Sequence, residues 1–163
     1  KEEFDIIVMS DVLEHVDDEK MAIEEAYRVL KKKGKLIITC PNKGLFGFLD
    51  VDNYSWHIRQ FSLLYKFIHK LKGRDVPKVR EGYRNKHKHY SLSELKELLS
   101  KFIILKYKRN GLMFNYIGNN IELFFRWVFN KNINFKRLKY FDYNFNFGKF
   151  SSSIIIIAQK NNN

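Results

Sequence analysis

Two short apolar segments on either side of a helical pattern most constrain how this chain of 163 residues folds. Phe4 to Met9 and Leu36 to Cys40 are apolar without alternation, which is typical of strands that are covered on both faces. The stretch between them has apolar residues at helical spacing. A strand, a helix and a second strand predict two parallel neighbours joined by a right-handed crossover.

The intervening helix is predicted to run from Asp18 to Lys33. Asp17 and Asp18 are candidate cap residues, because their carboxylates can accept from the first backbone N–H groups. Lys31, Lys32 and Lys33 then lie where the helix dipole favours cations, and Gly34 is placed just past the last turn.

A ligand site is predicted where the two strands end. In open parallel sheets, ligands bind beyond the carboxyl ends of the strands. In this chain those ends are Ser10 to His15 and Pro41 to Gly44.

These two segments also carry a family resemblance. SDVLEHV, which starts at Ser10, followed by RVLKKKGKLIITCPN, which ends at Asn42, resembles class I S-adenosylmethionine-dependent methyltransferases of the ubiquinone-biosynthesis type. The resemblance implies an α/β fold, a partial Rossmann-like sheet, with S-adenosylmethionine as cofactor. In that family the residue at the position of Ser10 lies beside the cofactor, so Ser10, Asp11 and Val12 become the candidate cofactor-binding residues.

Two family features have no counterpart here. The family holds the cofactor with a glycine-rich loop after its first strand and an acidic residue after its second. The eight glycines of this chain include no G-x-G. We therefore interpret the chain as a truncated frame or fragment that retains the fourth to seventh strands, and we expect it to bind the cofactor weakly or not at all.

Asp11, Glu14 and His15 form the sharpest chemical pattern, because residues three and four apart share a helix face. In ubiquinone O-methyltransferases and small-RNA 2′-O-methyltransferases, the resembling E-x-x-E-H holds magnesium. One interpretation is a magnesium ion on these three residues, with His89 or His87 as a further ligand. The favoured interpretation is a site without metal.

Without a metal, a methyltransferase mainly aligns donor and acceptor and removes a proton. His15 is the leading candidate base and Glu14 stands beside it. The competing interpretation is that both residues only anchor the loop. The H-x-Y-S element of the family resembles HKHYS here, which makes His89 and Tyr90 candidates for contact with the acceptor.

We predict one partial methyltransferase domain over residues 1–163. Residues 1–42 form the strand–helix–strand core, and residues 43–90 resemble an insertion of methyltransferases encoded among polysaccharide genes. That insertion is predicted to hold a lid helix with an apolar face from Phe61 to Leu71, ending at Gly73, and then an exposed loop.

Residues 91–163 are predicted to complete the sheet and to add an aromatic, basic insertion. Ser91 or Ser93 caps a helix, and strands follow at Phe102 to Lys108 and Ser153 to Gln159. By the resemblance, the last strand is the antiparallel seventh strand, inserted beside the fifth.

Charge is unevenly distributed. Residues 1–42 hold 7 Lys and Arg against 10 Asp and Glu, which leaves 23 against 8 for the remainder of the chain. A basic appended region favours an anionic acceptor or surface, such as a phosphate-bearing lipid, a sugar phosphate, an acidic glycan or RNA. The alternative is that these lysines only increase solubility.

Leu112 to Phe129 is apolar but interrupted by polar residues, so it fails the requirement of roughly 20 apolar residues for a membrane span. Met113, Ile117, Ile121, Phe124 and Val128 form one helical stripe. Packing in the core or against another copy or subunit is favoured for this stripe. Peripheral membrane contact through residues 112–129 is the second interpretation. RNA stacking is the third, on Tyr140, Tyr143 and Phe145.

The sequence thus predicts O-methylation of a sugar, lipid-linked or other small acceptor. Two alternatives remain, a non-catalytic remnant or partner subunit and an RNA 2′-O-methyltransferase-like chain, so the chain's status as an enzyme stays open. Cys40, the single cysteine, is predicted to be buried. A reducing cytoplasm fits a chain without a disulfide framework or an opening signal peptide, with the inner membrane face as a variant.

Overall fold

The computed structural model describes residues 2–50, 63–71, 73 and 87–161. Its elements are β1 (Phe4–Ser10), α1 (Glu19–Val29), β2 (Leu30–Pro41), η1 (Gly47–Leu49), α3 (Leu63–Leu71), α4 (Leu92–Leu98), β3 (Phe102–Asn110), α5 (Phe114–Phe129), α6 (Lys136–Tyr143), η2 (Gly148–Phe150) and β4 (Ser153–Lys160).

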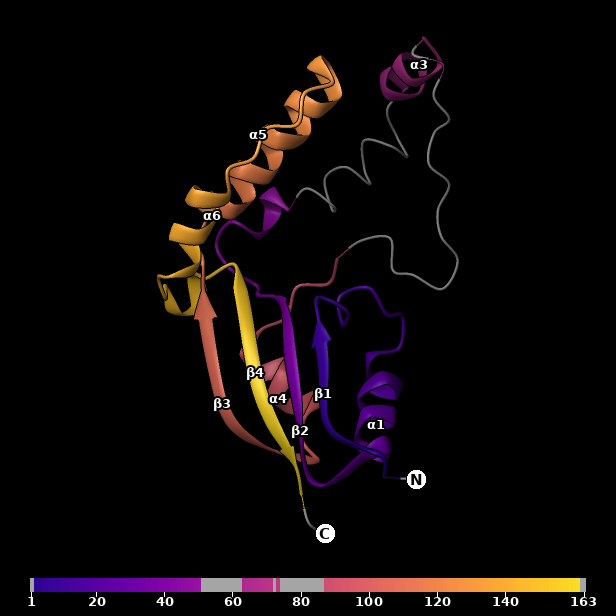
Figure 1. Cartoon of the computed structure of the whole chain (residues 1–163), viewed down its shortest axis with the longest axis vertical. Helices are drawn as coiled ribbons and strands as arrows, with labels where there is room; N and C mark the ends of the chain where they lie inside the picture. Colours follow the sequence, from indigo (N-terminus) through magenta and orange to yellow (C-terminus); the bar gives the residue numbers. More distant parts are fainter. Residues whose placement is uncertain (1, 51–62, 72, 74–86, 162–163) are drawn as a thin grey trace.

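The four strands form one sheet in the order β1-β2-β4-β3 (Figure 1). β1 and β2 are parallel, with Val8 opposite Ile37, whereas β4 is antiparallel to both β2 and β3. The predicted parallel pair is therefore confirmed. By the resemblance, the last strand was predicted to be antiparallel and beside the family's fifth strand, which is β2 here, and this position is confirmed as well.

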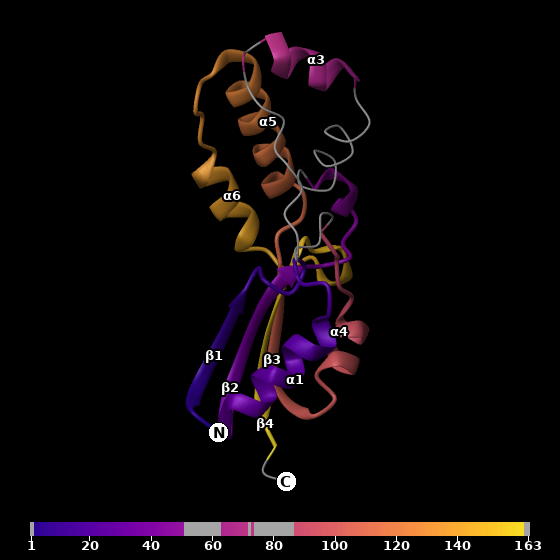
Figure 2. The same ribbon diagram turned by 90° about the vertical axis from the view of Figure 1, so that its right-hand side faces the viewer.

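Helices α1 and α4 cover one face of this sheet (Figure 2). Alternate residues of the central strands point into that layer and are fully or almost fully buried, among them Leu36, Ile38, Ile154 and Ile156. Cys40 belongs to the same core. Its burial raises the pKa of the thiol far above its ordinary value, so the thiol is an inert core group, as predicted.

The opposite face of the sheet is open at β1. Ile6 is 55% exposed and Val8 is 61% exposed. Among the described strands, only β2 pairs with β1, so the outer backbone edge of β1 has no strand partner in that part of the chain.

The α5–α6 hairpin stands beyond the end of the sheet at which β1 and β2 terminate (Figure 1). Two buried polar contacts join it to the sheet. The Tyr116 hydroxyl donates to the carbonyl of Ser152 at 3.4 Å, and the backbone N–H of Leu112 donates to Asp142 Oδ1 at 2.9 Å.

The predicted end of the first helix is wrong. α1 ends at Val29, and Lys31 to Lys33 belong to β2. Leu30 is fully buried and lies opposite Phe4 of β1. Burial of Leu30 and pairing with β1 therefore outweigh the lysine-rich signal for continued helix.

Gly34 is also not a helix cap. A Cβ atom at this position would lie 2.8 Å from the Lys31 carbonyl oxygen and 3.2 Å from that of Asp5. The glycine lets the first part of β2 approach β1 closely, while the preceding Lys33 takes the left-handed conformation, with φ of 61°.

Several other boundaries agree with the sequence predictions. Asp18 caps α1, and Ser91 caps α4 through a capping box with Glu94. Of the predicted lid, α3 is described, whereas Phe61 and residues 74–86 of the following loop lie outside the described residues. The lid function stays a prediction. α6 was not predicted, because its aromatic and basic residues show no clear helical period.

Lys33→Gly is expected to raise the free energy of unfolding by about 0.5–1 kcal/mol, because glycine adopts the left-handed conformation without the steric cost of a side chain. The matched control Lys32→Gly, at an exposed neighbour, is expected to lower it. Urea denaturation measures both. If Lys33→Gly lowered the free energy of unfolding, this would contradict the left-handed backbone conformation of Lys33.

Candidate functional site

The loop after β1 is tied to β2 through Thr39, whose carbonyl accepts from the backbone N–H of Asp11 at 3.0 Å and whose hydroxyl makes further contacts. The Thr39 hydroxyl donates to Asp11 Oδ1 at 3.2 Å and lies 3.1 Å from Ser10 Oγ. It also accepts from the backbone N–H of Asp11 at 3.1 Å. Asp11 has φ of 50°, so the chain turns sharply here. The candidate cofactor-binding residues Ser10, Asp11 and Val12 thus lie exposed at the carboxyl end of the parallel pair.

The next part of this loop is anchored through its backbone. The hydroxyl of the fully buried Tyr90 donates to the Leu13 carbonyl at 3.0 Å, and the Lys88 N–H donates to the Glu14 carbonyl at 3.5 Å. The interpretation that Glu14 anchors the loop therefore holds for its carbonyl oxygen, whereas its carboxyl group takes no part in these bonds.

That carboxyl group is buried at the strand ends. Glu14 is 2% exposed, and its Oε2 has no hydrogen-bond partner among the described residues. Burial raises the pKa of Glu14 to about 7, with added contributions from the charges of Asp11 and Asp50, while a backbone hydrogen bond and His87 oppose the rise. The side chain therefore exchanges its proton near neutrality.

Two histidines meet at one buried carboxylate beside it. Asp50 Oδ2 lies 2.8 Å from His89 Nε2 and 3.2 Å from His87 Nδ1. The His87 ring packs edge-on against the ring of His15, with centroids 4.4 Å apart. Glu14, His15 and His89, the predicted catalytic residues, thus lie around Asp50 and His87, which contribute to this one polar cluster.

The described residues give the magnesium interpretation no support. None of their groups of three or more His, Cys, Asp or Glu side chains has an arrangement that could hold a metal ion. Asp11 points to Thr39 at the surface, whereas Glu14 is buried.

The turn after β2 has a structural role. Asn42 is 2% exposed, and its amide group donates to the Ser151 carbonyl at 2.7 Å. A Cβ atom on Gly44 would lie 2.1 Å from the same carbonyl oxygen, so only glycine fits there. These contacts hold the turn against the segment that enters β4.

Sequence reasoning did not single out Thr39 or Asp50. Thr39 was read as one residue of a buried strand, and its role depends on pairing with Ser10, 29 positions away. Asp50 does fall within residues 43–90, the segment that resembles an insertion of other methyltransferases, and that resemblance was the available signal. Its contacts with His87 and His89 span 37 and 39 positions.

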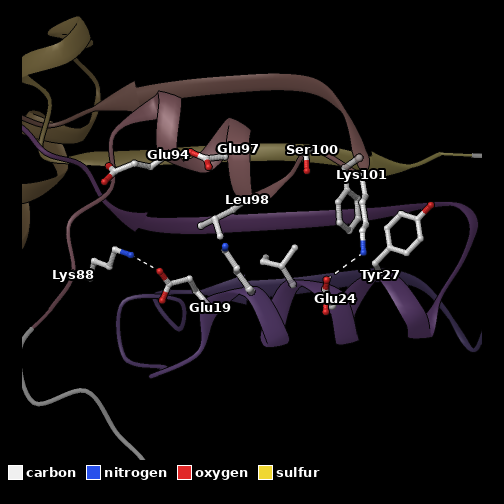
Figure 3. Close-up of a pocket in the computed structure, with 12 residues that line it drawn as sticks. Glu19, Glu24, Tyr27, Lys88, Glu94, Glu97, Leu98, Ser100 and Lys101 are labelled. Atoms are coloured by element: carbon white, nitrogen blue, oxygen red, sulfur yellow. Dashed lines mark hydrogen bonds and ion pairs between the residues drawn. The ribbon is translucent and has the colours of Figure 1, made fainter.

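A separate groove of about 380 Å³ lies between α1 and α4 (Figure 3). Its charged groups pair across it, Lys88 with Glu19 and Lys101 with Glu24 at 3.2 Å. Because these charges neutralise one another along the outer side of the helices, we assign the groove no chemistry.

No helix in the described part of the chain is long and apolar enough to cross a membrane. α5, the longest of them, has 16 residues.

Comparison with known proteins relates the sequence of this chain to methyltransferases. The sequence model of the family described as "Methyltransferase domain" matches residues 1–38. A protein of Methanocaldococcus jannaschii, named as uncharacterized protein MJ1123, is 34% identical over 90 residues, which are 52% of this chain and 40% of that protein.

Solved structures share the fold. A Galdieria sulphuraria protein described as a "putative sarcosine dimethylglycine methyltransferase" superposes with a TM-score of 0.50 at 12% identity, over 98% of this chain and 54% of its own. The [4+2]-cyclase SpnF superposes with a TM-score of 0.50 at 17% identity, over 98% of this chain and 50% of its own. This chain thus spans about half the length of such structures.

The fold is that of class I S-adenosylmethionine-dependent methyltransferases, and the predicted resemblance is confirmed. The subfamily is not specified by these comparisons. A fold alone does not define a reaction, and one of the two structures is named as a cyclase.

Glu14→Gln is expected to raise the free energy of unfolding at about pH 8 by roughly 2 kcal/mol and to change it much less at about pH 4. Below the ordinary pKa of glutamate, the carboxyl is neutral in both the folded and the unfolded chain. As the pH rises toward 7, the unfolded chain ionises first, so the buried glutamate progressively destabilises the fold. Glutamine cannot ionise and removes that cost.

Urea denaturation at the two pH values measures this difference, and the comparison cancels effects that do not depend on pH. Glu97→Gln, on the exposed side of α4, serves as the control. Equal effects of Glu14→Gln at both pH values would show that Glu14 titrates like an exposed carboxyl.

Proposed function

We propose that this chain forms the acceptor side of an S-adenosylmethionine-dependent methyltransferase that methylates a hydroxyl group. The observation that carries the proposal is the Glu14 carboxyl, buried without a partner for Oε2 where β1 ends. A base is most effective when its pKa lies near the working pH, and burial places the pKa of Glu14 there.

The residues around it take distinct roles in this proposal. Ser10, Asp11 and Val12 line the cofactor side, because the Thr39 hydroxyl fixes the turn that presents them. S-Adenosylmethionine, when bound, supplies the methyl group as part of a sulfonium ion. Glu14 or His15 takes the proton from the acceptor hydroxyl.

His89 lies on the acceptor side and is a positioning residue for the cluster. Asp50 Oδ2 contacts both His89 Nε2 and His87 Nδ1, and a Cβ atom on Gly47 would lie 2.7 Å from His89 Nδ1. The ring is therefore held from two sides. The rings of His87 and His15 are in T-shaped contact, so the carboxylate of Asp50 orients His15 indirectly.

The proposed acceptor is a small sugar or lipid-linked molecule that bears negative charge. Residues 43–163 hold 23 Lys and Arg against 8 Asp and Glu. A segment with this excess of positive charge in its sequence attracts anionic molecules. The alternatives of a non-catalytic remnant or partner subunit and of an RNA methyltransferase are not favoured by the comparisons.

Calorimetric titration of S-adenosylhomocysteine, the product of methyl transfer, tests the cofactor half of the proposal. We expect weak binding by the 163-residue chain, with Kd of about 1 mM, because the chain supplies contacts from only two strand ends. Thr39→Val is expected to weaken binding roughly threefold to tenfold, because it removes the hydroxyl that fixes Ser10 and Asp11.

Thr39→Ser keeps the hydroxyl and is the matched control, expected to bind like the wild type. Circular dichroism confirms that each protein is folded. Absence of binding to a folded chain, or equal binding by the valine and serine variants, would contradict the proposed cofactor side.

A further inference from the structure

One face of α5 is apolar and exposed. Ile121, Phe124 and Val128 are 36%, 53% and 40% exposed, and their spacing of three and four residues places them on one side of the helix. Phe129 is 55% exposed at the helix end. The rings of Phe124, Phe125 and Phe129 contact one another, with centroids 5.4 to 6.1 Å apart. Three residues of the stripe, for which packing in the core or against another copy or subunit was favoured, are therefore exposed.

The segment at α6 also exposes large aromatic side chains. Tyr140 is 72% exposed and Phe141 is 55% exposed on α6, and Phe145 follows at 45%. The rings of Phe141 and Phe145 contact each other with centroids 4.8 Å apart. Monomeric soluble domains seldom expose so many large apolar side chains in one region unless the region binds something.

The exposed charges of this hairpin are all positive. Residues 112–150 contain two acids, and neither is exposed. Glu122 pairs with Lys139 at 2.6 Å and accepts from the Phe135 N–H, whereas Asp142 is 1% exposed and accepts from the Leu112 N–H. The exposed charged residues are Arg126, Lys131, Lys136, Arg137 and Lys149.

The position of the hairpin suits contact with a large partner. Both views show the end of α5 far from the sheet, beyond the strand ends (Figures 1 and 2). A surface that contacts Phe124 and Phe129 would therefore leave α1 and α4 clear.

Charge complementarity selects the partner. A two-fold dimer through the α5 stripe would bring together two hairpins whose exposed charges are all positive, which is unfavourable. Single-stranded RNA binds through exposed rings that stack on bases, but the centre of this face includes the aliphatic Ile121 and Val128. The hairpin instead combines an exposed apolar stripe with exposed charges that are all positive, and this combination matches a lipid surface with anionic headgroups.

We propose that the α5–α6 hairpin docks on an anionic lipid surface, with the α5 stripe in contact with the acyl boundary and the basic side chains near the headgroups. The proposal does not depend on methyl transfer, because docking requires no cofactor.

Cosedimentation of the 163-residue chain with extruded vesicles tests this. We expect binding to vesicles of equal parts phosphatidylglycerol and phosphatidylcholine, and much weaker binding to phosphatidylcholine alone. Phe124→Ser combined with Phe129→Ser is expected to weaken binding to the anionic vesicles at least tenfold. Lys136→Gln combined with Arg137→Gln is expected to weaken it several-fold at low salt.

Met21→Ser is the matched control, because Met21 is 66% exposed on α1 and lies off the hairpin. Thermal unfolding followed by circular dichroism verifies that each variant folds. Equal binding to neutral and anionic vesicles would overturn the proposal.

Two other results would also overturn it. One is the absence of vesicle binding together with a dimer in size-exclusion chromatography that the double serine variant abolishes, which would assign the stripe to a second copy. The other is retention of single-stranded RNA that the same variant abolishes while vesicles stay unbound.

Discussion

The pairing of β2 with a parallel β1 on one side and an antiparallel β4 on the other is the constraint on which the site depends. It brings the ends of β1 and β2 and the start of β4 to the same end of the sheet. Asn42 and Gly44 then fix the turn after β2 against Ser151, and Thr39 fixes the turn after β1. Polar loops from three parts of the chain therefore converge at one end of the sheet.

This convergence carries a cost in stability. Glu14 is buried with one carboxyl oxygen that has no partner among the described residues, and a buried unpaired polar group is unfavourable. The Tyr90 hydroxyl and the Lys88 N–H donate to backbone carbonyls of the loop and hold it in spite of that cost. A group held in an unfavourable environment by its surroundings is typical of functional sites, where the raised pKa of an acid makes it a base near neutrality.

Much of the sheet could be predicted because its signals are local. The apolar runs of β1 and β2 and the caps Asp18 and Ser91 lie within a few residues of the elements they define. The end of α1 could not be predicted, because burial of Leu30 and its pairing with β1 outweigh the local sequence preference for a helix. The contacts of Asp50 with His87 and His89 join residues 37 and 39 positions apart, and a local sequence pattern does not predict contacts over such separations.

The central claim is that the carboxyl of Glu14 titrates near neutrality at the strand ends. NMR of the chain labelled with carbon-13 at the glutamate side-chain carboxyls measures this directly, and Glu14→Gln assigns the resonance. We expect one carboxyl resonance that titrates near pH 7 in the wild type and that is absent from the spectrum of the variant. It would be contradicted if the resonance lost in the variant titrates at the ordinary pKa of an exposed glutamate, roughly 4.3.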